Sequence, residues 1–315
     1  MSFILLGILN SQAAAAVGAD AGYITGGFTG SVVDTIEKFN LSAETISTLA
    51  ATLSTVNHLA TGFADSGTAG YTSGGQDSSG IINNVDKLIF ASDTNSSLGS
   101  ILSTATRDGA GFANKNVAGY MAGGRAGSPI VSTVNKISFP EDSQSTLGTG
   151  LSAGRQGNSG LEDEAVAGYS AGGNNVDQHS NVDKFAFPSE ARSTLASGLG
   201  GDRGEACGMS NYGTAGYVAG GFNDGFNPQD DIYKFTFPTD TASTLGSTLP
   251  ANRDNLGNNL NLQNSAGYVA GGDSPTSGTQ VNSIVKLDFS TETTSTLATT
   301  LSQAKNRITS FSNQG

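Results

Sequence analysis

Tryptophan is absent from this 315-residue chain, which also contains only one cysteine and two histidines. A single cysteine excludes an intramolecular disulfide, and we expect Cys207 to be a small buried apolar residue of a strand. His58 and His179 are too few for a zinc or copper site, so we expect no metal and no cofactor. Because no catalytic cluster is recognisable either, we predict that the protein is not an enzyme.

Charged residues are scarce as well: they make up 13% of the chain, and the formal net charge is −12. An acidic, charge-poor surface repels phosphate groups, which disfavours nucleic acid and anionic membranes as partners. The acids at 162–164 and 230–231 have no partner nearby in the sequence, so we expect solvated loop residues. The chain has no apolar run of about 20 residues, the length that spans a bilayer, so no membrane span is predicted.

Glycine, in contrast, is abundant, with 44 residues, and much of it belongs to a repeat. Ala-Gly-Tyr is followed two residues later by Gly-Gly six times, and the tyrosines are 48, 49, 49, 48 and 51 residues apart. A period of about 50 residues is typical of repeat architectures in which each unit is one supersecondary element. The tyrosines are Tyr23, Tyr71, Tyr120, Tyr169, Tyr217 and Tyr268.

A single repeat predicts four short strands. In the fourth unit they are expected at 169–173, 182–187 and 193–199, followed by 204–209 at the start of the next unit. Their alternating patterns and glycine-rich turns indicate antiparallel sheets. Six such sheets arranged radially form a β-propeller, so the predicted fold is all-β and six-bladed, with four-stranded antiparallel blades.

Each unit carries one lysine directly before an apolar or aromatic residue. We expect the lysine stem to pack between blades, with the ammonium at a carboxylate or in solvent. The six lysines are Lys38, Lys87, Lys136, Lys184, Lys234 and Lys286.

The unit resembles the kelch repeat. The kelch unit has an aromatic before Gly-Gly, a strand ending in an aromatic, a spaced tryptophan, and an arginine that opens the next inner strand. Tyr217 with Gly220–Gly221, Lys234–Phe235 and Arg253 match the first, second and last of these elements, while Thr244–Leu245 stands at the tryptophan position. The resemblance implies a kelch-like propeller, but the tryptophan departure means that kelch partners do not carry over.

The C-terminal end of the chain is predicted to close the ring. The first unit lacks an inner strand, and the chain stops where a seventh Ala-Gly-Tyr would begin, so placing Ile308–Phe311 in blade one removes both open edges. We therefore divide the chain into an apolar N-terminal anchor at 1–20, a six-repeat propeller at 21–306 and a closing strand at 307–315.

The N-terminal anchor is a short apolar run that requires cover from the ring or from another chain. Its first twelve residues resemble the leaders of phage structural proteins. The resemblance implies docking onto other virion or assembly proteins. The proposed anchor residues are Phe3, Ile4, Leu5, Leu6, Ile8 and Leu9.

Candidate binding residues come from the loops after each Gly-Gly, which antiparallel order places on the same face as the Leu-x-x-x-Arg turns. Variable loops on a rigid scaffold commonly carry binding, and Phe28, Phe222 and Phe226 suit a carbohydrate or protein ligand. Five cations assigned to one repeat position would either ring the axial channel and hold an anion or tie blades through carbonyls and acids. They are Arg107, Arg155, Arg203, Arg253 and Lys305.

Taken as a whole, these features favour a non-enzymatic binding module of a phage virion, either a tail or a capsid appendage that presents its loops to the host surface. The expected localisation is the virion or an extracellular surface. Two alternatives remain open: a secreted or cell-surface lectin-like propeller, and an intracellular kelch-type scaffold for protein interaction. Homo-oligomerisation is also left open by the sequence.

Overall fold

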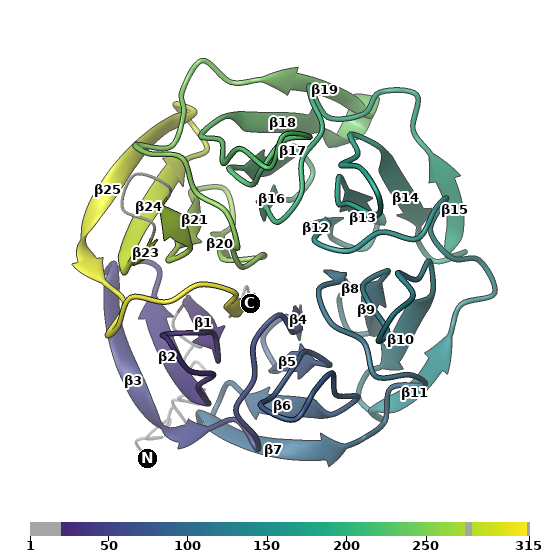
Figure 1. Ribbon diagram of the computed structural model, residues 1–315, viewed down its shortest axis with the longest axis vertical. Coiled ribbons are helices and arrows are strands. Elements are labelled where there is room, and N and C mark those ends of the chain that lie inside the picture. The colour runs from purple at the N-terminus through teal and green to yellow at the C-terminus, as the bar shows by residue number, and fades with distance from the viewer. Residues whose placement is uncertain (1–19, 275–278, 314–315) are drawn as a thin grey trace, which may run out of the picture.

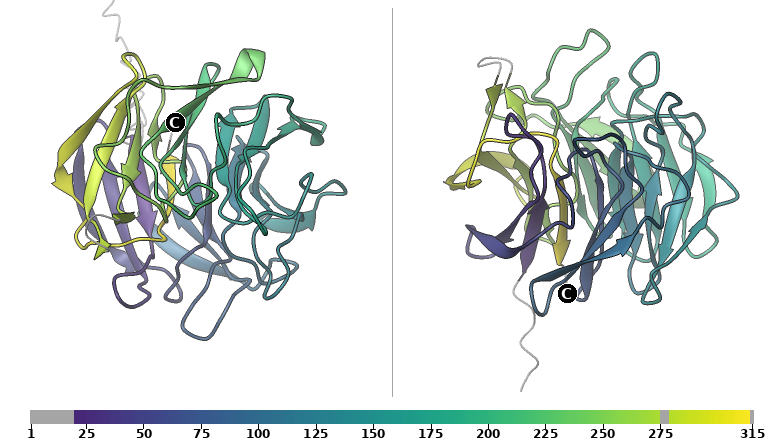
Figure 2. Two further views of the ribbon diagram at one scale, coloured as in Figure 1. Left: turned by 45° about the horizontal axis from the view of Figure 1, so that its top comes forward. Right: turned by 60° about the horizontal axis from the view of Figure 1, so that its bottom comes forward.

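A computed structural model describes residues 20–274 and 279–313, so the proposed anchor at 3–9 lies outside the described residues. The described chain forms six four-stranded antiparallel sheets, arranged as blades around one axis (Figure 1). In the turned views, the blades stand side by side and the connecting loops lie at the two ends of the ring (Figure 2). The predicted all-β, six-bladed propeller is confirmed.

Each blade runs from an inner strand at the axis to an outer strand on the outside of the ring. From the axis outward, blades 1 to 6 comprise β26 (Thr309–Asn313), β1 (Ala21–Thr25), β2 (Thr35–Asn40) and β3 (Thr45–Thr52); β4 (Thr61–Asp65), β5 (Ala69–Ser73), β6 (Val85–Ile89) and β7 (Thr94–Gly99); β8 (Ala110–Asn114), β9 (Ala118–Ala122), β10 (Val134–Ser138) and β11 (Ser143–Thr146); β12 (Ser159–Asp163), β13 (Ala167–Ala171), β14 (Val182–Ala186) and β15 (Ala191–Thr194); β16 (Cys207–Asn211), β17 (Ala215–Ala219), β18 (Ile232–Thr236) and β19 (Thr241–Thr244); and β20 (Asn261–Leu262), β21 (Ala266–Ala270), β24 (Ser283–Asp288) and β25 (Thr293–Thr300). A hairpin of β22 (Asp273–Ser274) and β23 (Thr279–Gln280) follows β21, and the single helical element of the described residues is a 3-10 turn at Phe237–Thr239.

Blade 1 combines strands from the two ends of the described chain. The C-terminal β26 pairs antiparallel with β1, and Phe311 lies opposite Tyr23. Closure by the C-terminal strand is therefore confirmed, although the strand covers 309–313 and begins one residue later than expected. This pairing leaves no free inner edge on blade 1.

The outer strands differ from the predicted lengths. In blade 4 the expected strand at 193–199 is wrong, because β15 ends at Thr194, whereas β3 of blade 1 continues for eight residues. Gly198 of blade 4 stands at the repeat position where Thr52 ends β3. Glycine weakens a strand because it offers no side chain to pack, and β-branched threonine favours one.

The glycine of each Ala-Gly-Tyr is explained by packing between blades. A Cβ at Gly119 would lie 1.9 Å from the ring of Phe63, which belongs to the inner strand of the preceding blade. An equivalent conflict occurs at the other five repeats, at Gly22, Gly70, Gly168, Gly216 and Gly267. Because glycine has no side chain, it leaves space for a large side chain of the neighbouring blade.

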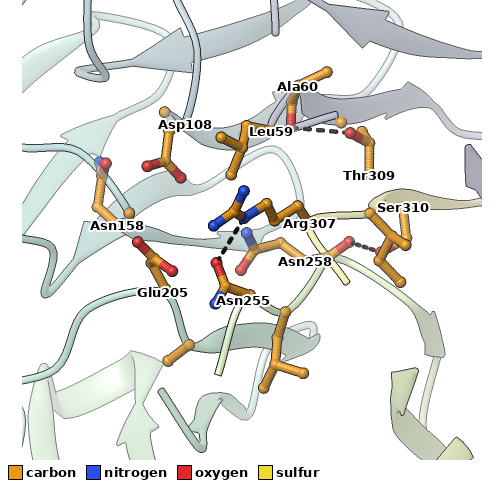
Figure 3. A pocket seen from close by; sticks show the side chains of 17 residues that line it. Leu59, Ala60, Asp108, Asn158, Glu205, Asn255, Asn258, Arg307, Thr309 and Ser310 are labelled. Carbon is orange, nitrogen blue, oxygen red and sulfur yellow. Dashed lines mark hydrogen bonds between the residues drawn. The ribbon is translucent and has the colours of Figure 1, made fainter. Parts of the chain in front are cut away.

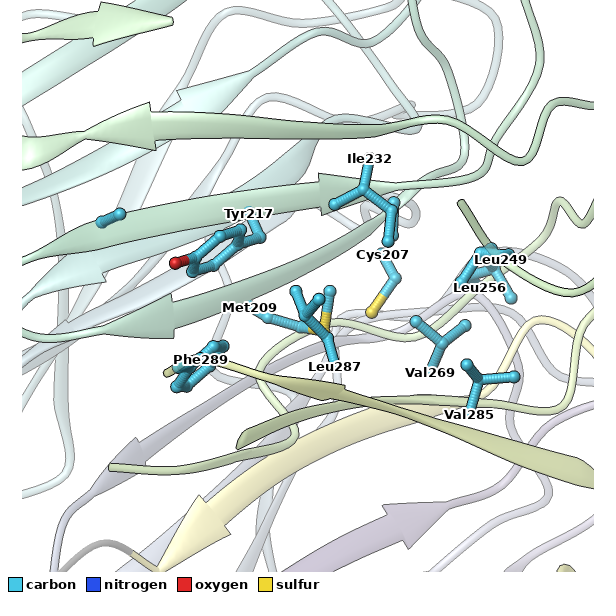
Figure 4. Close-up of a cluster of buried hydrophobic side chains, with 12 residues drawn as sticks. Cys207, Met209, Tyr217, Ile232, Leu249, Leu256, Val269, Val285, Leu287 and Phe289 are labelled. Atoms are coloured by element: carbon cyan, nitrogen blue, oxygen red, sulfur yellow. The ribbon is translucent and has the colours of Figure 1, made fainter. Parts of the chain in front are cut away.

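The hydrophobic core consequently lies between the blades. In Figure 4, Met209 and Tyr217 of blade 5 pack with Val269 and Leu287 of blade 6. Cys207 belongs to the same cluster and is fully buried, which confirms the prediction for it. Burial raises the pKa of its thiol to about 12, so the sulfur stays protonated at neutral pH.

The repeat tyrosine and lysine act together at each blade interface. Tyr120 lies opposite Lys136 in blade 3, and both donate to Glu190 Oε1 of blade 4 over 2.6 Å. Burial and this carboxylate raise the pKa of Tyr120, which keeps its hydroxyl a donor. The predicted place of the lysines, between blades at a carboxylate, is confirmed in every blade. The pairs are Lys38–Asp93, Lys87–Asp142, Lys136–Glu190, Lys184–Asp240, Lys234–Glu292 and Lys286–Glu44.

Three of the five acids expected to be solvated make specific polar contacts. Glu162 accepts the hydroxyl of Tyr212, and Asp163 accepts the backbone N–H of Gly213, both over 2.6 Å and both from blade 5. Asp231 pairs with Arg203 at 2.8 Å. The prediction of solvated acids is wrong for Glu162 and Asp163, whose partners lie in another blade, whereas the side chain of Asp231 is 38% exposed although it pairs with Arg203.

Candidate binding site on the loop face

Four of the five predicted cations do not form a ring that faces the axis. Arg155, Arg203, Arg253 and Lys305 are 1–5% exposed, and their head groups bind within the blades. Arg155 pairs with Asp183 at 2.6 Å, and Lys305 pairs with Glu37 at 2.5 Å. Arg253 donates to the backbone oxygen and hydroxyl of Ser283. The alternative prediction named acids and carbonyls as the bound groups, and those are the groups found, but each bond joins a connector to the blade that it enters and does not tie two neighbouring blades.

Arg107 was assigned to the wrong repeat position. The position of Arg155 is occupied in the preceding repeat by Thr106, which is 2% exposed. Arg107 comes one residue later and pairs through its backbone with Arg125 of the next loop. The repeat leucine fixes this alignment. Each of the other four cations stands four residues after its leucine, whereas Arg107 stands five residues after Leu102.

Two residues after the cation position of each repeat, the backbones of the six connectors form a hydrogen-bonded ring around the axis. The ring residues are Leu59, Asp108, Gly157, Glu205, Asn255 and Arg307. The six ring residues all have φ between 51° and 65°, a left-handed backbone that turns the chain from the connector into the inner strand. The backbone bonds run from Leu59 N to Arg307 O, Asp108 N to Leu59 O, Gly157 N to Asp108 O, Glu205 N to Gly157 O, Leu256 N to Glu205 O and Arg307 N to Asn255 O. Each bond joins the entrances of two neighbouring blades, so the loop face has a fixed centre.

Below this ring, the inner strands close the axis. A Cβ at Gly111 would lie 2.0 Å from the carbonyl oxygen of Gly62, and one at Gly160 would lie 1.9 Å from that of Gly111. The backbones of neighbouring inner strands are therefore in direct contact. Asn259 of blade 6 also crosses the axis and donates to the carbonyl of Gly111 in blade 3, over 2.8 Å.

What remains at the axis is a small polar well. Its volume is about 30 Å³, space for only a few water molecules. Asp108, Glu205 and Arg307 line it from three different connectors and point toward one another (Figure 3). Burial raises the pKa of Asp108, and burial together with the charge of Asp108 raises that of Glu205. The charge of the Arg307 guanidinium opposes both shifts.

A larger pocket opens beside the well, where blades 5, 6 and 1 meet. Its volume is about 400 Å³, within the range of small-molecule sites. Arg307 and Asn255 line both the well and this pocket. We call it the rim pocket, and its lining residues are Phe28, Pro228, Asp254, Asn255, Asp273, Ser274, Gln280, Asn306 and Arg307.

Carboxylates and amides form the polar wall of the rim pocket. The Nδ2 of Asn255 donates to Asp254 Oδ1 over 2.8 Å and to Asp273 Oδ2 over 3.0 Å. Asn306 donates to the same Asp273 oxygen over 2.6 Å. Burial and the nearby Asp273 raise the pKa of Asp254, while Arg307 and the Asn255 amide oppose the shift.

The three predicted binding aromatics differ in their exposure and location. Phe28 lies half-buried in the rim pocket, with the Arg307 guanidinium carbon 6.0 Å from its ring centroid. Phe222 is only 7% exposed and packs against Phe226, which is itself 68% exposed. Phe222 is therefore a support for its loop, whereas Phe28 and Phe226 remain accessible.

Sequence reasoning found Phe28 but missed the acids and amides beside it. Asp254 and Asn255 directly follow the cation Arg253, and Asn306 and Arg307 directly follow the cation Lys305. Their signal is variation: the two residues after each repeat cation differ from unit to unit, while the cation and leucine recur. Asp273, similarly, is the first residue after its Gly-Gly pair.

Two absences hold for the part of the chain that the structure describes. No group of three or more His, Cys, Asp or Glu side chains within 20–274 and 279–313 converges in a way that would hold a metal ion. In the same segments, no helix has the length and hydropathy needed to cross a membrane.

Comparison with known proteins gives no relative. No protein-family model matches the chain, and no curated protein matches it either. What is established is therefore a six-bladed β-propeller of four-stranded antiparallel blades.

Proposed function

We propose that this propeller is a non-enzymatic binding module that uses its loop face to attach to a surface. The observation that carries this proposal is the rim pocket: it opens on the face where the loops vary, on a ring whose recurring residues serve packing. Variable side chains on a rigid scaffold are a common arrangement for recognition.

A second feature of the loop face supports attachment. Val176 is 88% exposed and Phe226 is 68% exposed, and their loops are joined by the Gln178 N–H bond to Asp224 Oδ1. Two exposed apolar side chains on neighbouring, linked loops suit contact with another macromolecule. The same face thus offers a polar pocket and a small apolar contact.

We further propose that the module is a kelch-like virion appendage, docked through its N-terminal segment with the loop face turned to the host. The resemblance of Met1–Gln12 to phage leaders supports the virion role, and the Tyr…Gly-Gly and Arg elements of each repeat support the kelch relation. A secreted lectin-like propeller is the second candidate, and the aromatic and polar lining of the rim pocket favours it.

The attachment face can be tested by flow cytometry with labelled full-length protein on a panel of bacterial strains. The double variant Val176→Ser/Phe226→Ser should reduce labelling at least tenfold. The matched control is Val117→Ser/Val166→Ser, which changes two exposed valines on the opposite face and should label like the parent. Attachment through the loop face is overturned if no strain is labelled or if the control variant loses labelling instead.

The virion role has its own test. A chain lacking residues 1–12 should keep the unfolding midpoint of the parent and fail to enter assembled particles. Incorporation of the shortened chain at parental levels would exclude docking through this segment, and absence of the full chain from particles would exclude the virion role.

A further inference from the structure

We propose that the rim pocket binds a saccharide unit that carries no acidic group. The inference rests on the proposed binding function and adds the chemical class of the ligand. Three properties of the pocket carry it: its shape and apolar walls, its hydrogen-bonding groups and its charge.

The size and walls of the pocket suit a sugar ring. The volume of about 400 Å³ is at the small end of ligand sites. Phe28 from blade 1 and Pro228 from the blade 5 loop supply apolar surface, and they belong to segments 200 residues apart in the sequence. A sugar has apolar C–H faces and polar edges, so it requires this combination of a carbon wall with a polar floor.

The floor is rich in hydrogen-bond acceptors. Asp254 and Asp273 present carboxylates, and the Asn255 amide lies between them. Carboxylates accept hydrogen bonds, and the hydroxyl groups of a ligand would donate to those of Asp254 and Asp273.

The charge of the pocket selects against acidic ligands. Two carboxylates line it against one cation, Arg307. Arg307 is also engaged elsewhere: its Nε donates to Asn255 Oδ1 over 3.2 Å, and its charge acts on Asp108 and Glu205 in the well. A phosphate, sulfate or uronate would meet two carboxylates and only one cation in this pocket, so the net effect is repulsion.

The site is held rigidly before any ligand arrives. Phe28 and Asn306 exchange two backbone hydrogen bonds, of 2.9 and 3.1 Å, and Asp254 and Asp273 exchange two more, of 3.0 and 3.3 Å. These bonds fix the apolar wall and the acceptors on neighbouring connectors. A preorganised site loses little conformational entropy on binding.

The chain's lack of tryptophan allows a direct binding assay. In the full-length Phe28→Trp variant, the only tryptophan would lie in the rim pocket and keep the aromatic wall. The probes are lactose, cellobiose, maltose and chitobiose, with digalacturonic acid and inorganic phosphate as acidic counterparts. At least one uncharged disaccharide should change the tryptophan emission saturably, and the acidic probes should bind at least tenfold more weakly.

Calorimetric titration of the same disaccharide then assigns the site. Phe28→Ala and Asp273→Ala should each weaken binding at least tenfold. Phe226→Ala and Asp177→Ala change an exposed aromatic and an exposed acid elsewhere on the loop face and should leave it unchanged. Thermal unfolding of each variant separates lost binding from lost folding, and the Phe28→Trp titration stands even where Phe28→Ala fails to fold.

Several outcomes would overturn the inference: no saccharide binds, the acidic probes bind as well as the neutral ones, both pocket variants bind normally, or a lysine-rich peptide rather than a sugar fills the pocket. Surface labelling without saccharide binding would sink this inference and leave the attachment function standing. Saccharide binding in the rim pocket without any surface labelling would support this inference and overturn the attachment function.

Discussion

In blades 1 and 4, the repeat cation pairs with an acid of the third strand from the axis. Glu37 lies beside Lys305, and Asp183 lies beside Arg155. In blade 3, the neutral Asn135 accepts from the hydroxyl of Ser103. Blade 2 breaks this pattern, because Asp86 is 3% exposed while the cation position holds Asn57.

Asp86 is consequently a buried carboxylate with incomplete compensation. Its Oδ2 accepts from the backbone N–H of Ser54 over 3.1 Å, but its Oδ1 has no hydrogen-bond partner in the structure. Burial raises the pKa of Asp86. A raised folded-state pKa of an acid means that stability is greatest below the ordinary pKa and falls as pH rises through the folded value.

Asp86→Asn should therefore stabilise the protein at high pH. We expect the free energy of unfolding to rise by about 1 kcal/mol at pH 8, because an uncompensated buried charge is removed. The gain should vanish near pH 3, where the parent's Asp86 is protonated. Urea denaturation at both pH values measures the difference.

Asp183→Asn is the matched control for this substitution. It removes the partner of buried Arg155, so it should lower the free energy of unfolding at pH 8 by about 3–5 kcal/mol. A loss of stability in Asp86→Asn at pH 8 would show that Asp86 is favourably ionised in the folded state.

Residue types that serve every blade were predictable, and their partners were not. The repeat tyrosine, lysine and glycine recur with the period, so their structural role follows from the sequence. The acids that bind the repeat lysines lie 54 to 58 residues further on for the pairs in blades 1 to 5. That distance exceeds one repeat, so the pairing emerges only when the blades are stacked.

At the scale of the element, each blade is joined to the next by a lysine and an acid, and in blades 1, 2, 3 and 5 the repeat tyrosine donates to the same acid. Tyr120 stacks between Phe112 and Phe187, with ring centroids 5.2 and 5.5 Å away, while its hydroxyl reaches Glu190. The aromatic ring and the hydroxyl therefore contribute separately. The hydroxyl and Lys136 converge on one carboxylate oxygen, which couples the two hydrogen bonds.

This coupling predicts a double-mutant cycle. Tyr120→Phe keeps the stacked ring and removes the hydroxyl, so it should lower the free energy of unfolding by about 1–2 kcal/mol. In a chain that already carries Glu190→Gln, the same change should cost about 1 kcal/mol less. Urea denaturation of the parent, the two single variants and the double variant gives the coupling; strictly additive effects would argue against a shared acceptor.

Strand existence was easier to predict than strand length. The inner three strands of each blade are fixed by packing on both faces, and their central residues follow the repeat. The outer strands are half exposed, and β15 and β3 differ in length although both follow a Ser/Thr-rich stretch. The residues after the repeat leucine differ from blade to blade, so the repeat does not specify where these strands end.

At the scale of the whole molecule, the axis is the feature that the sequence could not supply. One of the two predictions for the cations places them around an axial channel, but glycine contacts and Asn259 fill the axis. The period determines the number of blades and not how closely the inner strands approach one another. That approach depends on Gly62, Gly111 and Gly160, whose neighbours across the blades are visible only in three dimensions.

The candidate site follows from the same closure. The rim pocket lies where the last described connector, with Asn306 and Arg307, meets the loop that begins at Phe28. Residues from the two ends of the chain therefore share one binding surface. The site exists only if β26 completes blade 1, so ring closure underlies both the fold and the proposed function.

The most direct measurement of this closure is the unfolding of a chain that ends at Ala304, with and without a synthetic peptide of residues 305–315. The shortened chain lacks β26 and Lys305, the partner of buried Glu37. We predict that it loses the cooperative thermal transition of the parent, and that the peptide restores it while a scrambled peptide does not. A shortened chain that unfolds alone with the parent's midpoint and cooperativity would contradict a ring closed by its C-terminal strand.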